Sequence, residues 1–447
     1  MRFSGFEHLL SHYAEISPDS PALLYEGPSG RETCTFSALQ KVVKEKAEEL
    51  RASGKTCLGV FADGSFACVT EIFAAAAAGL QTVLLDPSIS GEVLSGLMKY
   101  ADIDLLWGDD ELCEELAPML GAGVPDPQER KGKLLFFTSG TTDRSKAVVL
   151  TDQSLMNSAW NGAEKLPLHP EDILLCMLPL SHVFGFVCGL LWGLSCGCCV
   201  ALGRGARHYT DDCAYFRPTA VSVVPLMLGF LLRYGCLNDE LQLVLAGAGD
   251  CPEALLSAAQ AKGLRVSFGY GLTETSSGVA ISVSGDPFAM EVCPDDTITT
   301  AEDGEILIHA PTCIMQGYYK LPEATSAVLR NGILHTGDLG FLDEEGKLHI
   351  TGRKKEILVL TDGTKIFLPE YEKSLAAALG TEELAVSEKN GKILLHLPKN
   401  EQTEREILES IRPVTEQLPR GHQISSVVFH DGPLPRTRTG KIKRYEL

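Results

Sequence analysis

The sequence predicts an α/β protein in which a large N-terminal α/β domain with a β-rich subdomain precedes a small α+β domain. Strand-like and helix-like segments alternate from about residue 58 to about residue 269, which is typical of α/β layers around a largely parallel sheet. From about Glu305 short strands such as EILIH and KLHI follow one another instead. The chain has 447 residues, more than one ordinary hydrophobic core accommodates.

The N-terminal elements follow from their apolar patterns. Residues 35–50 have apolar side chains at helical spacing behind a threonine suited to cap a helix. LGVFAD, from Leu58, predicts a strand, EIFAAAAAGL a helix and QTVLLD the next strand. Further strand candidates are KLLFF, AVVL, AVSVVP, LQLVLAG and LRVSFG.

The last fifth of the chain differs from the rest in pattern and in charge. After Gly352 we expect a strand, a helix at 369–379, strands near Leu384 and Ile393, a helix at 404–417 and a last strand at Val427. Residues 353–447 carry 16 Lys and Arg against 14 Asp and Glu, a net charge of +2, whereas the remaining residues have a net charge of −22. We therefore predict two domains, 1–352 and 353–447.

Composition argues against several classes of protein. The formal net charge of −20 does not suit nucleic acid or an anionic membrane as a partner. The 14 cysteines are scattered and the first residues do not follow a signal-peptide pattern, so we expect reduced thiols in a cytoplasmic protein. Cys196, Cys198 and Cys199 have no second cluster at ligand spacing, which argues against zinc. Small residues interrupt the apolar stretch 186–202, and we expect a buried helix and strand there, not a membrane span.

A strand, a small polar loop and a second strand occupy residues 134–150. The loop offers hydroxyls, open backbone N–H groups and one cation, which together suit a polyphosphate. Its residues are Thr138, Ser139, Gly140, Thr141, Thr142 and Lys146. The spacing is not that of a Walker loop, and a solvated turn is the alternative interpretation of this loop taken alone.

A second glycine-rich segment, FGYGLTET at residues 268–275, places Glu274 beside Thr273 after a predicted strand. Magnesium bound to substrate phosphates needs only one or two such carboxylate oxygens from the protein. This segment therefore adds a candidate Mg²⁺ ligand to the candidate phosphate loop.

Three more motifs follow along the chain. His335-Thr-Gly-Asp338 sets a carboxylate in a tight turn, where it could hold ribose hydroxyls. Arg353 follows a predicted strand, and the basic segment 435–444 carries Lys441. Each motif alone could be a turn or a solvated tail, but their joint occurrence in this order argues against that interpretation.

The ordered set of motifs resembles the adenylate-forming superfamily of acyl-CoA synthetases, adenylation domains and beetle luciferases. PLSHVFG from Pro179, LAGAGDCP from Leu245, and GEILI and MQGYY from Gly304 onward extend the resemblance over nearly the whole chain. LVLTDGTKIFLPEYE, from Leu358, is most similar to long-chain acyl-CoA synthetases. The resemblance implies a large N-terminal domain, a small mobile C-terminal domain and an active site between them.

The resemblance also implies how ATP would be held. Thr138 to Lys146 would hold the β- and γ-phosphates, and Thr273 and Glu274 would meet the α-phosphate and Mg²⁺, with Glu274 as the metal ligand. The nucleotide pocket would be lined by Gly247, Ala248, Gly249, Tyr270 and Gly271. Within it, Tyr270 would stack on adenine.

The remaining implied roles concern the ribose, the hinge and the chemistry. Asp338 and Arg353 would hold the ribose, Lys355 would lie at the hinge, and Lys441 would bridge the substrate carboxylate, ribose and α-phosphate. Such a lysine neutralises charge while a carboxylate attacks the α-phosphate. The implied enzyme is an AMP-forming acid–thiol ligase that makes an acyl-adenylate with ATP and Mg²⁺, releases pyrophosphate and transfers the acyl group to coenzyme A.

Three loop positions depart from the family pattern. Asp143, Ser145 and Ala147 stand where relatives usually have glycine, proline and glycine. Asp143 adds a negative charge close to the proposed triphosphate, so a non-catalytic, nucleotide-binding relative is one alternative.

The expected substrate is a carboxylic acid without an α-amine. Amino-acid-activating relatives usually have an aspartate near His182, and an unpaired ammonium in an apolar pocket is costly. By resemblance His182 would gate the pocket and thiol tunnel, and a satisfied core histidine is the other interpretation. Apolar walls are expected from Val183, Phe184, Val187, Val223, Val224, Pro225 and Met227. A fatty or other apolar acyl chain is the first choice and an aryl acid the second.

Coenzyme A is the acceptor that the resemblance implies. A stand-alone adenylating enzyme that loads an acyl or peptidyl carrier protein is the alternative, since the slightly basic C-terminal domain could meet an acidic partner. We expect a monomer or a homodimer.

Overall fold

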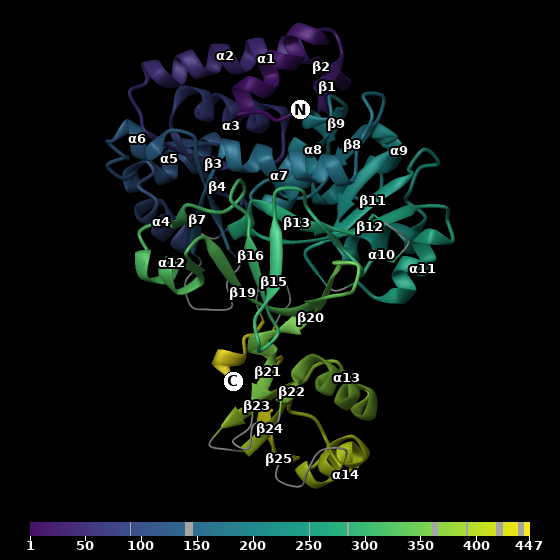
Figure 1. Ribbon diagram of the computed structural model, residues 1–447. Coiled ribbons are helices and arrows are strands. Elements are labelled where there is room, and N and C mark those ends of the chain that lie inside the picture. The colour runs from purple at the N-terminus through teal and green to yellow at the C-terminus, as the bar shows by residue number, and fades with distance from the viewer. Residues whose placement is uncertain are drawn as a thin grey trace.

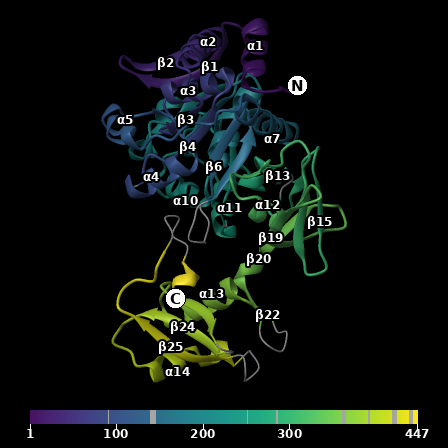
Figure 2. The same ribbon diagram turned by 90° about the vertical axis from the view of Figure 1, so that its left-hand side faces the viewer.

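The computed structural model describes residues 1–89, 91–138, 146–249, 251–283, 286–359, 365–389, 392–416, 423–436 and 442–447. They form a large body and a small body, and strand β20 (Leu348–Arg353) leads from one to the other (Figures 1 and 2). The predicted α/β fold, with a large N-terminal and a small C-terminal domain, is confirmed. The boundary at residue 352 stays a prediction.

The first large sheet is six-stranded, in the order β17-β7-β6-β4-β3-β5. Strands β6, β4, β3 and β5 are parallel, whereas β7 and β17 join antiparallel. Apolar side chains cover both of its faces: Leu134 and Phe136 join one hydrophobic cluster and Leu135, between them, joins another. Such burial on both faces is typical of parallel sheets. The bounds are β3 Cys57–Phe61, β4 Gln81–Leu85, β5 Leu105–Trp107, β6 Lys133–Phe137, β7 Ala147–Thr151 and β17 Gly317–Tyr318.

The second large sheet is nine-stranded, in the order β14-β13-β12-β11-β10-β8-β9-β1-β2. Its central strands, from β12 to β1, are parallel, and antiparallel strands complete both edges. The bounds are β1 Pro21–Gly27, β2 Gly30–Thr35, β8 Ile173–Cys176, β9 Cys199–Leu202, β10 Ala220–Val223, β11 Leu243–Gly247, β12 Arg265–Leu272, β13 Ser277–Ile281 and β14 Glu291–Val292.

Helices pack on and between these sheets (Figure 1). The expected cap is present, since the Thr35 hydroxyl accepts a hydrogen bond from the Ala38 N–H and begins α2. The bounds are α1 Phe6–Ile16, α2 Phe36–Ala52, α3 Phe66–Ala78, α4 Gly91–Tyr100, α5 Asp110–Leu116, α6 Pro127–Arg130, α7 Asp152–Lys165, α8 Trp192–Ser195, α9 Asp212–Phe216, α10 Pro225–Tyr234, α11 Glu253–Gln260 and α12 Pro322–Val328.

The apolar stretch 186–202 lies inside the large body. It forms a π-helix, Gly185–Leu191, which continues into α8 and then into β9. The expected helix and strand are therefore present, and Phe186, Leu190 and Leu194 are fully buried. Within the described part of the chain, no helix combines the length and hydropathy that crossing a membrane requires. All fourteen cysteines are free thiols.

The predicted β-rich subdomain is a five-stranded antiparallel sheet near the junction of the two bodies. The bounds are β15 Thr297–Thr300, β16 Glu305–His309, β18 Leu329–Arg330, β19 Ile333–Leu342 and β20 Leu348–Arg353. Strands β19 and β20 are adjacent, with Asp338 opposite Arg353. This pairing brings two predicted site residues together.

The small body has a hydrophobic cluster of its own, which contains Leu375, Leu395 and Ile411. The helices begin and end close to their predicted bounds, because Pro369 sits in the first turn of α13 and Thr403 caps α14. The bounds are β21 Ile357–Val359, β22 Lys365–Phe367, α13 Leu368–Leu379, β23 Ala385–Lys389, β24 Lys392–Pro398, α14 Glu404–Thr415 and β25 Ile424–His430.

Candidate active site

Tyr270, Asp338 and Arg353 form one connected group of side chains. The Tyr270 hydroxyl donates to Asp338 Oδ2 at 2.9 Å, and Arg353 Nε lies 2.8 Å from Asp338 Oδ1. The Asp338 residue is only 3% exposed. Burial, and next the Asp338 charge, raise the pKa of Tyr270, so its hydroxyl remains a donor. The structure thus joins three residues to which the motifs had assigned adenine and ribose contacts.

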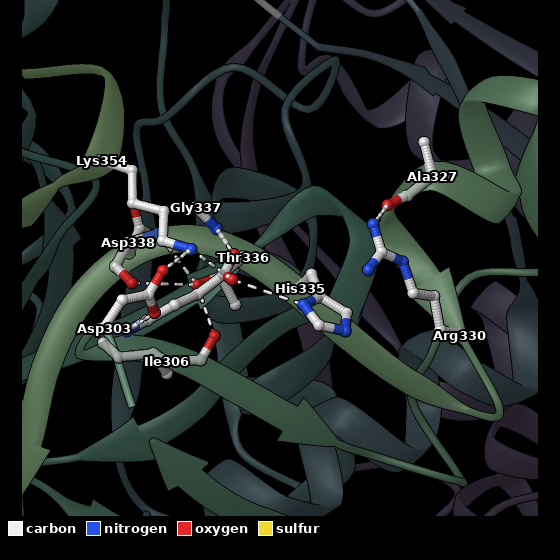
Figure 3. Close-up of polar contacts among 10 residues, drawn as sticks. Asp303, Ile306, Ala327, Arg330, His335, Thr336, Gly337, Asp338 and Lys354 are labelled. Atoms are coloured by element: carbon white, nitrogen blue, oxygen red, sulfur yellow. Dashed lines mark hydrogen bonds and ion pairs between the residues drawn. The ribbon is translucent and has the colours of Figure 1, made fainter. Parts of the chain in front are cut away.

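The irregular segment of β19 that carries Asp338 is fixed by hydrogen bonds drawn in Figure 3. The Thr336 hydroxyl donates to the Ile306 carbonyl at 2.7 Å and accepts the Asp338 N–H at 3.0 Å. Gly337 has a φ of +72°, which glycine adopts without strain. The sequence predicted a tight turn for His335 to Asp338, whereas the structure places these residues within strand β19, where the register against β16 shifts.

Glu305 and Lys354 hold this segment of β19 in place, and neither residue was predicted to belong to the site. Glu305 accepts the Gly337 N–H at 2.9 Å and the Lys354 ammonium at 2.7 Å. Lys354 also pairs with Asp303 at 2.6 Å. Burial acts to raise the pKa of Glu305, but Lys354 and the Gly337 N–H outweigh it and the pKa lies below its ordinary value. The sequence signal that could have identified Glu305 is a charged residue at the start of an otherwise apolar strand.

An open cavity of about 700 Å³ borders this segment of β19 on the side of Glu305. Its lining includes Asp303, Glu305, Arg330, His335 and Lys354, which Figure 3 shows in part. Tyr270 and Asp338 are not among the lining residues, so we do not assign the nucleotide to this cavity.

Glu274 and Lys146 both contact Tyr318, a residue for which no role was predicted. The Tyr318 hydroxyl donates to Glu274 Oε1 at 2.7 Å, and Lys146 Nζ lies 4.5 Å from the centroid of the Tyr318 ring. Thr138 closes the base of the predicted phosphate loop, since its N–H donates to the Lys146 carbonyl at 3.0 Å. The candidate Mg²⁺ ligand and the candidate phosphate lysine therefore share a neighbour.

The glycine-rich ends of β11 and β12 lie side by side. Gly247 ends β11 opposite Gly269 of β12, and Ala248 has a φ of +61°. A Cβ atom on Gly247 would lie 3.2 Å from the Phe184 ring, and one on Gly271 would lie 1.7 Å from the Ser277 carbonyl oxygen. Close approach of the Phe184 ring and of the Ser277 carbonyl therefore explains why glycine stands at these two positions.

His182 lies on the exposed side of the segment that carries Phe184. The main-chain N–H of His182 donates to the Pro179 carbonyl, and its main-chain carbonyl accepts the Phe186 N–H at the start of the π-helix. Desolvation by the surrounding residues lowers the pKa of His182, and the Asp86 carboxylate acts in the opposite direction. The buried-core interpretation of His182 does not fit this exposure.

Several predicted site residues cannot be placed. Ser139, Gly140, Thr141, Thr142, Asp143, Ser145 and Lys441 lie outside the described residues, as does the side chain of Lys355. Gly249 follows Ala248, and Thr273 opens the short 3-10 helix Thr273–Thr275 that carries Glu274. The residues that can be placed fit a nucleotide with Mg²⁺, because a buried carboxylate, a cation and an open glycine-containing main chain lie in one region.

Comparison with known proteins agrees with this geometry. Residues 117–319 match the family model described as AMP-binding enzyme. The 2-succinylbenzoate–CoA ligase of Bacillus mycoides (strain KBAB4) is 28% identical over 480 residues, which cover 98% of this chain and 97% of the relative. These matches confirm the predicted resemblance to adenylate-forming, AMP-binding enzymes.

Solved structures show the same fold. The O-succinylbenzoate coenzyme A synthetase of Bacillus subtilis, in complex with AMP, matches with a TM-score of 0.81 and 24% identity over 98% of this chain and 97% of that one. The Mycobacterium tuberculosis fatty acyl CoA synthetase matches with a TM-score of 0.72 and 22% identity over 98% and 96% of the two chains. The arrangement of a large and a small domain is therefore that of solved acyl-CoA synthetases.

Proposed function

We propose that this protein is an AMP-forming acid–thiol ligase, which activates a carboxylic acid with ATP and transfers the acyl group to coenzyme A. The connected group Tyr270–Asp338–Arg353, together with the contacts of Glu274 and Lys146 with Tyr318, is the observation that carries this proposal. The AMP-binding match over residues 117–319 and the names of the relatives support it.

The proposed binding of ATP follows from the chemistry of each side chain. Tyr270 offers a ring to adenine, and Asp338 with Arg353 offers an acceptor and a donor to the ribose hydroxyls. Lys146 and the loop that precedes it hold the phosphates. Glu274 holds Mg²⁺, which when bound offsets the charge of the phosphates and of departing pyrophosphate.

The proposed reaction needs no nucleophile from the protein. The substrate carboxylate attacks the α-phosphate and pyrophosphate leaves; the thiol of coenzyme A then attacks the acyl carbonyl and AMP leaves. Holding the reactants together can supply about 7–11 kcal/mol in favourable cases. We assign Lys441 to the contact between carboxylate and α-phosphate, where its charge offsets their repulsion, and we assign the hinge to Lys355.

An aromatic acid of the 2-succinylbenzoate type is the substrate we propose. The Bacillus mycoides relative, 28% identical over nearly its full length, has a name that specifies 2-succinylbenzoate, whereas the fatty acyl CoA synthetase that shares the fold is 22% identical. We therefore place the aromatic acid ahead of the fatty chain that was the first choice from sequence. Val183, Val187 and Val223 are buried, and apolar walls of this kind suit an aromatic ring as well as an alkyl chain.

Pyrophosphate release with a panel of acids tests the proposal. The panel holds 2-succinylbenzoate, substituted benzoates, fatty acids and α-amino acids, each with and without coenzyme A. We expect release with an aryl acid and a thioester only when coenzyme A is present. Release without any thioester would support the carrier-protein alternative, and no release with any acid would support a non-catalytic relative.

A further inference from the structure

We propose that Tyr318 is a positioning residue, which orients the Glu274 carboxylate toward Mg²⁺ and holds Lys146 beside the phosphates. The inference deepens the proposed function and rests on it. Neither the sequence motifs nor the relatives' names assign Tyr318 a role. Its two contacts reach two motifs that are far apart in sequence.

The hydroxyl of Tyr318 fixes one carboxylate oxygen of Glu274. Tyr318 Oη donates to Glu274 Oε1 at 2.7 Å, a length typical of a hydrogen bond to a charged acceptor. The main chain of Glu274 is held as well, since the Met315 N–H donates to its carbonyl at 2.8 Å. With Oε1 engaged and the backbone fixed, Oε2 is left to meet a metal ion in a defined direction.

The ring of Tyr318 holds the cation. Lys146 Nζ lies 4.5 Å from the ring centroid, within the range of a cation–π contact. Lys146 immediately precedes β7, so its side chain starts from a strand and not from the middle of the loop. A ring beneath the ammonium limits the rotamers of a long, flexible side chain.

The position of Tyr318 is itself well determined. It is paired with Val148 in the antiparallel ladder of β17 and β7, and its N–H donates to Thr325 Oγ1 at 2.8 Å. The residue is 8% exposed.

The chain offers a matched control beside it. The Tyr319 hydroxyl donates to Asp102 Oδ2 at 2.7 Å, so Tyr319→Phe removes a hydrogen bond of the same kind and length. Asp102 is not a residue of the proposed site. Tyr318→Phe removes only the hydroxyl from Glu274, whereas Tyr318→Leu also removes the ring from Lys146.

The test measures binding of α,β-methylene-ATP by calorimetry with and without MgCl₂, together with the Mg²⁺ concentration that gives half-maximal pyrophosphate release. We expect Tyr318→Phe to reduce the gain in analogue affinity that Mg²⁺ provides and to raise the half-saturating Mg²⁺ concentration. Each change should be about ten-fold, as for other residues that orient a metal ligand. The KM for ATP at saturating Mg²⁺ should change little. Tyr318→Leu should raise that KM as well, and Tyr319→Phe should match the wild type in every measurement.

The outcomes separate the two proposals. If Tyr318→Phe only lowers the melting temperature and leaves the Mg²⁺ dependence of binding and release as in the wild type, the residue is structural and the inference is overturned while the proposed function stands. If the wild type neither binds the analogue nor releases pyrophosphate with any acid, the proposed function fails and the inference falls with it.

Discussion

A single carboxylate, that of Asp338, organises the nucleotide end of the proposed site. Its two oxygens are engaged by Tyr270 and by Arg353. At 3% exposure a carboxylate needs such partners, since a buried charge without them is strongly unfavourable. The same contacts set the direction in which the oxygens would face ribose hydroxyls.

Asp338→Asn should weaken ATP binding. The amide keeps the size of the side chain but loses the charge that pairs with Arg353, and hydrogen bonds to charged groups contribute about 1.5–3 kcal/mol. We expect ATP affinity to fall at least ten-fold by calorimetry. Asp343→Asn is the control, because Asp343 is a turn residue that pairs with His349 outside the proposed site; equal effects of both substitutions would contradict the assigned role.

The sequence motifs predicted the three members of the proposed nucleotide group, but not the residues that hold them in place. Tyr270, Asp338 and Arg353 lie in recognisable motifs, and two of them are cross-strand neighbours. Tyr318, Glu305 and Lys354 act through residues distant in sequence, and only the folded arrangement shows those contacts. No periodicity in the sequence encodes them.

At the scale of elements, the pair β19 and β20 connects the segment proposed to bind ribose to the proposed hinge. Asp338 lies on β19 and Arg353 ends β20, while Glu305 on β16 accepts hydrogen bonds from both Gly337 of β19 and Lys354. The strand register therefore sets both the site and the point where the chain leaves the large body (Figure 2).

Glu305→Gln tests this link through the pH dependence of stability. The folded-state pKa of Glu305 lies below its ordinary value of 4.5, so the stabilisation is present above that value and is lost as the pH falls through the folded-state pKa. The wild type should exceed Glu305→Gln in unfolding free energy at pH 7, and the gap should shrink in acid. Chemical denaturation at pH 7 and at acid pH measures this difference in unfolding free energy, with exposed Glu302→Gln as the control. A difference that does not depend on pH would count against the ion pair.

Elements were predictable where one periodicity or one capping residue dominates. Thr35 before α2, and Pro369 in the first turn of α13, are examples. The π-helix Gly185–Leu191 was read only as part of a buried helix, because an extra residue per turn leaves no mark in an all-apolar stretch. The hairpin of β1 and β2 was missed, since its polar strand β2 (GRETCT) has little apolar alternation.

At the scale of the whole molecule, the two bodies differ in charge and are joined through the segment after β20. We propose Lys355 as the hinge residue about which the small domain reorients between the two half-reactions. The backbone there forms the short 3-10 helix Lys354–Glu356, and Lys354 is anchored to Asp303 and Glu305. Rotation would therefore begin after Lys354.

Lys355→Pro should slow thioester formation more than adenylation, because proline fixes φ at the hinge. Single-turnover measurements of each half-reaction separate the two steps. Lys355→Ala is the control, since it removes the side chain and leaves the backbone free. Equal slowing of both half-reactions by the proline variant, or equal effects of the two variants, would contradict the hinge assignment.

The small body should lose stability in mild acid. Burial, and next the neighbouring His430 and Lys389, lower the pKa of His396 to about 4. His396 Nδ1 and His430 Nε2 are 2.9 Å apart, and Ser387 Oγ lies 2.7 Å from His396 Nε2. Because an unfolded histidine has a pKa near 6.5, protons bind the unfolded state more readily and stability falls from about pH 6.5 to about pH 4.

Hydrogen exchange of β24 at pH 7 and pH 5, corrected for intrinsic rates, measures this loss in the intact protein. His396→Gln should remove most of the pH dependence, whereas exposed His309→Gln should leave it unchanged. Protection in β24 that is the same at both pH values in the wild type would contradict the expected role of His396.

The central claim is that a substrate carboxylate attacks the α-phosphate of ATP, and transfer of isotope tests it most directly. The acid that the pyrophosphate panel identifies is labelled with oxygen-18 in its carboxylate and supplied with ATP, MgCl₂ and coenzyme A, and the AMP is analysed by mass spectrometry. The account predicts one labelled oxygen in each AMP formed together with the thioester. Unlabelled AMP, or label in inorganic phosphate accompanied by ADP, would contradict it.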